Sequence, residues 1–176
     1  MLAIILMSTL IVSGCSGESV KHLQFSDEEL NQIKVTTDGD YKIFTVPKRN
    51  WKIKAWLPHF RISRGKTKIF QATRHYDGEE MITVIATIID PQVGCTDLIS
   101  CFEYRKRLKR NIDDCTIFSE NDRIIISQLG KLVKTTTILK YYDNVCVDIF
   151  IITSQINQRG LDNTQRIVES LQILPR

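Results

Sequence analysis

The sequence is poor in the residues from which most catalytic and metal sites are built. Its 176 residues include three histidines, His22, His59 and His75, and eight glycines that do not cluster into a phosphate-binding loop. No Gly-x-Ser-x-Gly segment marks a nucleophile elbow, and no histidine has a recognisable nucleophile and carboxylate near it in the sequence. The spacings of the histidines and cysteines do not match those of zinc ligands. We therefore expect no catalytic residue, no metal site and no cofactor.

No apolar run at the start of the chain is long enough to span a membrane. Leu2 to Val12 is an uncharged, mostly apolar run of eleven residues, whereas a membrane-spanning helix needs about twenty. Eleven residues are typical of the hydrophobic region of a signal peptide. Ser13 and Gly14 follow, so Val12-Ser13-Gly14-Cys15 resembles the lipobox of bacterial lipoproteins. The resemblance implies cleavage before Cys15, a diacylglycerol thioether on its sulfur, and a fatty acid such as palmitate on its new amino group.

The lipobox divides the chain into a leader, a tether and a domain. We expect residues 1–14 to be removed as a signal peptide, residues 15–38 to hold the lipidated Cys15 and a tether, and residues 39–176 to form one globular domain facing the periplasm. An Asp after the lipidated cysteine retains lipoproteins in the inner membrane, so Ser16 favours the outer membrane.

Two alternatives for the leader stay open. A signal peptide normally opens with Lys or Arg, whereas Leu2 follows Met1 here. Either the terminal amine supplies the charge, or the true start lies upstream. The other possibility is that residues 1–14 form a buried helix and that Cys15 is an ordinary thiol.

Composition separates this chain from disordered proteins but names no partner. Hydrophobic residues make up 43% of the chain and charged residues 25%, as in ordinary globular proteins. The formal net charge of +4 is mild, and by itself it indicates no particular partner. Export makes nucleic acid an unexpected partner.

Four further cysteines, Cys95, Cys101, Cys115 and Cys146, follow Cys15. An even number in an exported chain suggests two disulfides, although buried thiols in an ordinary core are the alternative. A helix over residues 97–111 would hold Cys95 and Cys115 about 22 Å apart, too far for a disulfide. Of the two pairings left, Cys95 with Cys101 and Cys115 with Cys146 distorts the chain least.

Period-two alternation of apolar residues predicts a strand-rich chain. The expected strands are 41–46, 51–57, 59–63, 66–73, 81–89, 123–129, 131–142, 145–153 and 171–174. Helices are expected at 97–112 and 161–171, with a capped helical turn after Ser26, and Gly130 and Asp143-Asn144 read as tight turns. This order predicts an α+β fold, an antiparallel sheet flanked by two main helices.

The first of these helices is strongly basic. Five cations fall within six consecutive positions, Arg105, Lys106, Arg107, Lys109 and Arg110. They form a possible contact face for anionic lipid headgroups, an acidic protein partner or a cell-wall polyanion. The alternative is a solvated face whose long side-chain stems lie along apolar neighbours.

The order of elements from residue 40 to 175 resembles the PsbP-like fold, and within it DcrB-type bacterial lipoproteins. The local similarities are Phe44-Thr45-Val46-Pro47 and the segment Ile167-Val168-Glu169-Ser170-Leu171-Gln172-Ile173. The resemblance implies an α/β/α sandwich that acts as a non-catalytic adaptor or protein-binding module of the cell envelope. One alternative is an immunity protein that binds a toxin delivered into the periplasm. A second is a cell-wall or lipid hydrolase.

Overall fold

The computed structural model describes residues 19–76, 80–108, 114–120, 122–154 and 156–176. The leader, Cys15, Lys109 and Arg110 lie outside the described residues. The described residues form two antiparallel sheets with helices packed against them, which confirms the predicted α+β class. The strands divide between two sheets, a division that the alternation pattern does not specify.

Among the described residues, the larger sheet has seven strands in the order β4-β5-β6-β10-β9-β8-β7. They are β4 (Arg61–Gly65), β5 (Lys68–Tyr76), β6 (Glu80–Ile88), β10 (Val145–Ser154), β9 (Val133–Tyr142), β8 (Arg123–Leu129) and β7 (Thr116–Glu120). The smaller sheet, in the order β1-β2-β3-β11, contains β1 (Val35–Asp38), β2 (Tyr41–Thr45), β3 (Trp51–Trp56) and β11 (Gln172–Pro175).

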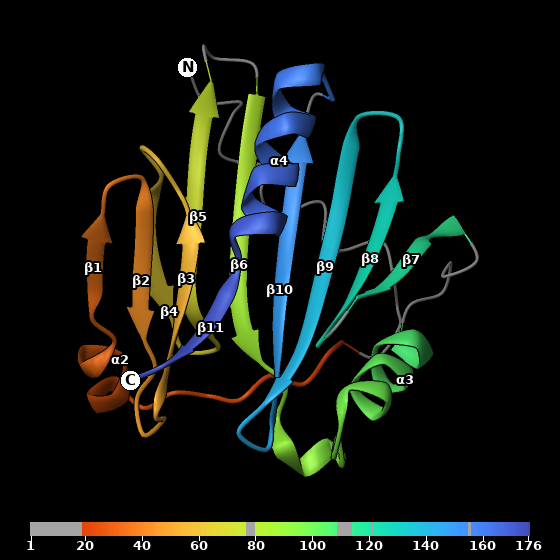
Figure 1. Ribbon diagram of the computed structural model, residues 1–176. Coiled ribbons are helices and arrows are strands. Elements are labelled where there is room, and N and C mark those ends of the chain that lie inside the picture. The colour runs from red at the N-terminus through yellow and green to blue at the C-terminus, as the bar shows by residue number, and fades with distance from the viewer. Residues whose placement is uncertain (1–18, 77–79, 109–113, 121, 155) are drawn as a thin grey trace, which may run out of the picture.

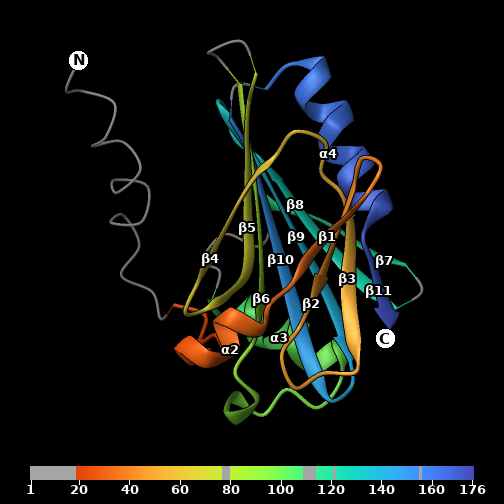
Figure 2. The same cartoon turned by 90° about the vertical axis from the view of Figure 1, so that its left-hand side faces the viewer.

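Three α-helices, α2 (Asp27–Gln32), α3 (Leu98–Leu108) and α4 (Gln158–Ser170), and a 3₁₀ turn at Pro91–Val93 complete the described elements. In Figure 1, α4 lies in front of β6 and β10. Figure 2 shows α4 and the smaller sheet on the same side of the larger sheet. The helix α3 packs on β8 and β9 from the opposite face.

The pleat of β8 explains how one strand serves both faces. Ile124 and Ile126 are buried in the apolar cluster under α3, whereas Ile125 packs against the main core on the α4 side. Successive side chains of a strand point to opposite faces of the sheet. The main core lies between the two sheets, where the rings of Phe44 and Phe70 stack with centroids 3.8 Å apart.

Most turns and caps follow the local chemistry of the sequence. Asp143 and Asn144 adopt φ values of 53° and 58° between β9 and β10, as a type I′ hairpin turn requires. Ser26 and Glu29 form a reciprocal capping box at the start of α2. The last helix begins at Gln158, earlier than expected, because the side chain of Asn157 caps it.

The folded domain reaches further toward the amino terminus than residue 39. The Leu23 amide donates to the Ile88 carbonyl at 2.8 Å, and the Asp90 amide donates to the Lys21 carbonyl at 3.0 Å. Phe25 and Ile33 are 5% and 1% exposed, so both belong to the packed interior. Part of the segment expected to be a tether is therefore attached to the domain.

Candidate functional site

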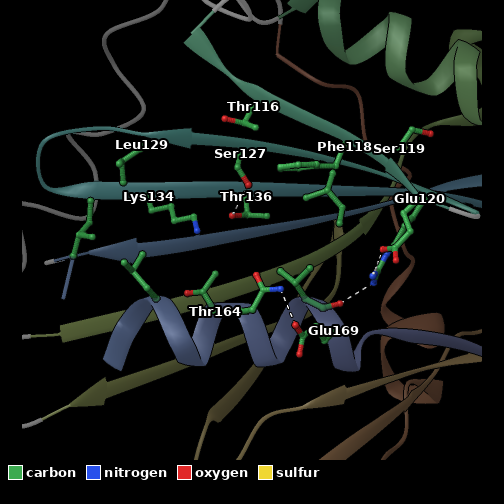
Figure 3. Close-up of a pocket in the computed structure, with 16 residues that line it drawn as sticks. Thr116, Phe118, Ser119, Glu120, Ser127, Leu129, Lys134, Thr136, Thr164 and Glu169 are labelled. Atoms are coloured by element: carbon green, nitrogen blue, oxygen red, sulfur yellow. Dashed lines mark hydrogen bonds and ion pairs between the residues drawn. The ribbon is translucent and has the colours of Figure 1, made fainter. Parts of the chain in front are cut away.

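An open groove of about 710 Å³ lies between α4 and the strands β7, β8 and β9. Figure 3 shows its two walls, with side chains of the three strands on one side and of α4 on the other. Its apolar lining comes from Phe118, Ile125, Leu129, Ile156, Leu161 and Val168. This volume falls within the range of ligand-binding clefts in proteins.

The groove exists because α4 is too narrow to cover the whole face of the larger sheet. One stripe of α4 faces inward, and its residues Thr164, Ile167 and Val168 are buried. Glu169 and Gln165, on the exposed side of the helix, form part of the groove wall. Figure 1 shows that α4 lies over the centre of the sheet and leaves the strands toward β7 uncovered.

A short chain of hydroxyl hydrogen bonds fixes α4 to the sheet. The Thr164 hydroxyl donates to the Gly160 carbonyl at 2.8 Å, and its oxygen lies 2.6 Å from the hydroxyl of Thr153 on β10. Because the single proton of Thr164 is used by Gly160, Thr153 is the donor to Thr164. Both threonines are buried, so this chain sets the position of one groove wall.

Arg123 joins the two walls at one end of the groove. Its Nη1 donates to the Val168 carbonyl of α4 at 2.9 Å, and its Nη2 pairs with Glu120 Oε2 at 2.8 Å. A planar guanidinium can hold two such partners in fixed geometry. At the other end the β8–β9 turn presents Leu129, which is 69% exposed.

The strand β7 forms the outer rim and is an edge of the larger sheet. It pairs with β8 on one side, and all five of its residues are exposed. Ile117 and Phe118 are 43% and 57% exposed. An exposed, apolar edge strand offers unpaired backbone N–H and C=O groups to another chain.

A second, smaller hollow of about 390 Å³ lies between α4 and the smaller sheet. Its cations are held by aromatic rings, with Arg166 4.2 Å from the centroid of Trp56 and Lys54 4.6 Å from that of Tyr41. Lys54 also pairs with Asp38 at 2.9 Å. These contacts among its own side chains make it a weaker candidate than the groove.

The structure divides the predicted basic face. Lys106 and Arg107 are exposed, whereas Arg105 turns toward the sheet, where its Nη2 lies 3.1 Å from Asp148 Oδ2. Asp148 is 2% exposed, and His22 Nε2 lies 3.5 Å from the same oxygen. Arg105 thus compensates a buried charge. A contact role for Lys106 and Arg107 stays a prediction, and Lys109 and Arg110 lie outside the described residues.

The four described cysteines gather in the apolar cluster beneath α3. Cys101 and Cys146 are buried, and Cys95 and Cys115 are partly buried at its border. All four are thiols in the structure. Cys101 and Cys146 belong to the same buried cluster, and Cys95 packs against it. The pairing itself stays a prediction.

The described residues contain neither a candidate metal cluster nor a candidate membrane-spanning helix. Within them no group of three or more His, Cys, Asp or Glu residues is arranged to hold a metal ion. In the same part of the chain, no helix has the length and apolar character needed to cross a membrane.

The fold and the groove define an α+β protein whose larger sheet has one half-covered face and an open edge. No protein-family model and no curated protein matches the sequence. Among solved structures the chain is similar to LpqN, involved in cell envelope biogenesis of Mycobacterium tuberculosis. The match covers 88% of this chain and 99% of that chain, at 11% identity and a TM-score of 0.46. A likeness of this degree carries no conclusion about function.

Proposed function

We propose that the chain is a lipid-anchored, non-catalytic binding module of the bacterial cell envelope that docks a protein partner along β7 and the adjoining groove. The observation that carries this proposal is the position of an exposed edge strand, which carries the apolar pair Ile117-Phe118, on the rim of an open groove. Together they offer backbone hydrogen bonds and an apolar recess on one continuous surface.

The mode of binding that fits this surface is strand addition. An extended segment of the partner would hydrogen-bond to the edge of β7 that pairs with no other strand among the described residues, and would extend the sheet by one strand. Thr116, Phe118 and Glu120 share the groove-facing side of β7, because residues two apart point the same way. Alternate side chains of the partner would then reach the groove, where Ile125 and Val168 supply apolar contacts and Arg123 a charge.

The anchor half of the proposal rests on the lipobox, Val12 to Cys15. Residues from Lys21 onward are hydrogen-bonded into the domain, so an extended chain would place at most about 20 Å between Cys15 and Lys21. Lys21 is also attached to α3, because its backbone amide donates a hydrogen bond to the Tyr104 hydroxyl at 2.9 Å. This arrangement supports a domain held close to the membrane with α3 near the lipid surface, where Lys106 and Arg107 would meet anionic headgroups.

Site-specific photo-crosslinking in cells tests the docking surface. A photoreactive residue at Phe118 should crosslink to one protein in near-stoichiometric yield. The same residue at Ile99 of α3, which is 63% exposed, provides the matched control and should not capture that protein. The identity of the captured protein distinguishes an envelope component from a toxin. Equal capture from Phe118 and Ile99, or capture from Ile99 alone, would place the docking surface elsewhere.

Fatty-acid labelling tests the anchor separately. Replacement of Cys15 by Ala should abolish incorporation of labelled palmitate and leave an unprocessed precursor. The Cys95→Ala variant serves as the control and should be labelled and processed normally. Normal labelling of Cys15→Ala would exclude the lipobox assignment but would leave the groove proposal intact.

A further inference from the structure

The smaller hollow lies where the last turns of α4 meet the outer face of the smaller sheet. Lys54 and Trp56 of β3 point outward, because Ile53 and Ala55 alternate with them and are fully buried. Tyr41 of β2 is paired directly with Trp56 in the register of the sheet. These outward side chains form the floor of the hollow, and its wall comes from Arg166, Glu169 and Ser170 of α4.

Short connections hold the wall and the floor together. The Trp56 amide donates to the Ser170 hydroxyl at 2.9 Å, and this hydroxyl donates to the Ile167 carbonyl at 2.9 Å. The strand β11 follows α4 directly and pairs with β3, which brings Gln172 opposite Lys54 (Figure 1). The hollow is therefore formed by the fold itself, as small-molecule sites in proteins usually are.

Arg166 lies over the ring of Trp56. Its guanidinium carbon is 4.2 Å from the ring centroid, a cation–π contact, and Trp56 is only 7% exposed although it points outward. Among the described residues, none accepts a hydrogen bond from the Arg166 guanidinium or forms an ion pair with it. The N–H groups of a guanidinium form a planar fork that matches a carboxylate. Arg166 is thus held in place with its donors available to a ligand.

Glu169, three residues further along α4, brings the opposite charge to the same hollow. Residues three apart on a helix are neighbours, yet the described part of the chain contains no ion pair between Glu169 and Arg166. Glu169 Oε1 instead accepts from the Gln165 side chain at 2.7 Å. The last turn of a helix also carries a partial negative charge, which favours a cation there. A cationic and an anionic position therefore lie side by side.

The other charge in the lining is already balanced. Lys54 pairs with Asp38 at 2.9 Å and lies 4.6 Å from the centroid of the Tyr41 ring. Arg166 and Glu169 are consequently the two lining charges that have no partner of opposite charge among the described residues. A ligand that carried a single charge would satisfy one of them and lie beside the like charge of the other. A ligand with both charges satisfies the pair.

We propose that the smaller hollow binds an amino acid in its zwitterionic form. The carboxylate accepts hydrogen bonds from Arg166, and the ammonium group donates to Glu169. Both groups are attached to one carbon atom, so they can meet two charges that are neighbours on one helix face. The volume of about 390 Å³ lies within the range of small-molecule sites. This site is independent of the lipid anchor and of strand addition at β7, although Glu169 also lines the groove.

NMR titration of the full chain with single amino acids tests the proposal. The chain has two tryptophans, so the indole N–H resonance of Trp56 reports on the hollow and that of Trp51, 0% exposed in the main core, is the internal reference. Alanine, glutamate and lysine are compared at equal ionic strength with acetate and methylammonium, each of which carries one of the two charges. At least one amino acid should shift the Trp56 resonance to saturation and leave Trp51 in place. Acetate and methylammonium should each bind at least about tenfold more weakly.

Substitutions assign the two charges. Arg166→Gln and Glu169→Gln should each weaken binding by about tenfold or more, since each removes a charged hydrogen-bond partner. Arg166→Lys should weaken it too, because an ammonium lacks the planar fork. Arg107→Gln, at an exposed cation of α3, is the matched control and should bind as the unaltered chain does. An unchanged Trp51 resonance verifies the fold of each variant, and Glu169→Gln decides if Arg166→Gln disturbs it. Capture of a partner from Phe118 should be unaffected by Arg166→Gln.

Three results would overturn the assignment of this site. The first is a Trp56 resonance that none of the three amino acids shifts. The second is acetate or methylammonium binding as tightly as the amino acids, which would mean a site for a simple ion. The third is unaltered binding in Glu169→Gln or in a folded Arg166→Gln chain.

Discussion

The hydroxyl chain that fixes α4 predicts which of two substitutions, at Thr153 or at Thr164, destabilises the fold more. Thr153 donates to Thr164, and Thr164 donates to the Gly160 carbonyl. Thr164→Val keeps the volume and shape of the side chain but removes the acceptor of the Thr153 proton. Thr153 is 1% exposed, so water cannot replace the lost partner without a structural change.

The magnitudes follow from leaving a buried donor without a partner. A buried unsatisfied polar group costs about 1–3 kcal/mol, whereas a hydrogen bond removed with both of its partners is nearly neutral. We expect Thr164→Val to destabilise the fold by about 2 kcal/mol. We expect Thr153→Val to cost less, about 1 kcal/mol, because Thr164 keeps its bond to Gly160. The double variant should be less destabilised than the sum of the two.

Equilibrium urea unfolding of the four chains measures this double-mutant cycle. The midpoints should shift in the order given while the slope of the free energy of unfolding against urea stays constant. A coupling of at least about 1 kcal/mol between the two positions is expected for residues in direct contact. Strictly additive effects would refute the hydrogen bond between the two threonines, and a larger loss for Thr153→Val than for Thr164→Val would refute its assigned direction.

The remaining predictions concern charges. Asp148→Ala should destabilise the fold by about 2–4 kcal/mol, because it leaves Arg105 partly buried without its anion. Thermal unfolding measures the loss. Asp162→Ala, at an exposed carboxylate that accepts from the neutral Gln158 side chain, is the control that should cost under about 1 kcal/mol. Equal losses for the two would contradict the account of Arg105. A hydrogen bond from the Ser26 amide lowers the pKa of Glu29, and a smaller effect in the same direction comes from the hydrogen bond with Lys48. The stabilisation that this carboxylate provides is therefore present above its ordinary pKa, and it is lost as the pH falls through the lowered pKa. Unfolding measured across this acid range should show less pH dependence in Glu29→Gln, and an unchanged profile would refute the linkage.

The sequence predicts those features that depend on neighbouring residues. The strand at β8 matches its expected range of 123–129, and the Asp143-Asn144 turn has the positive φ values that a tight hairpin needs. The segment expected at 81–89 forms the interior strand β6, which lies between β5 and β10. In each of these segments the local pattern and the tertiary environment require the same conformation, so the pattern is sufficient.

Features that depend on distant partners are not specified by local pattern. The short strand β1 gains its conformation from pairing with β2, and β7 from pairing with β8. Arg105 looks like a surface cation because Asp148, its partner, lies 43 positions away in the sequence. The groove likewise requires the position of α4 relative to β7. Its one visible signal in the sequence is the apolar pair Ile117-Phe118 in an otherwise polar segment.

The position of Cys101 and Cys146 in one buried cluster shows the same limit. The sequence places Cys95 before and Cys115 after a predicted rod-like helix, whose described part is α3, Leu98–Leu108. It does not indicate which strand passes beneath the middle of that rod. The strands beneath α3 are β8 and β9, and their place in the sheet depends on long-range pairing.

Hydrogen exchange of β7 in the presence of the partner captured from Phe118 tests the central claim most directly. If an extended segment adds to the edge, the outward-facing amides of β7 should become protected, with smaller changes in α4 and at Leu129. The backbone of β4, the opposite edge of the larger sheet, should exchange at an unchanged rate. Protection confined to β4 or to α3, with β7 unaffected, would contradict the proposal that the partner docks on this edge.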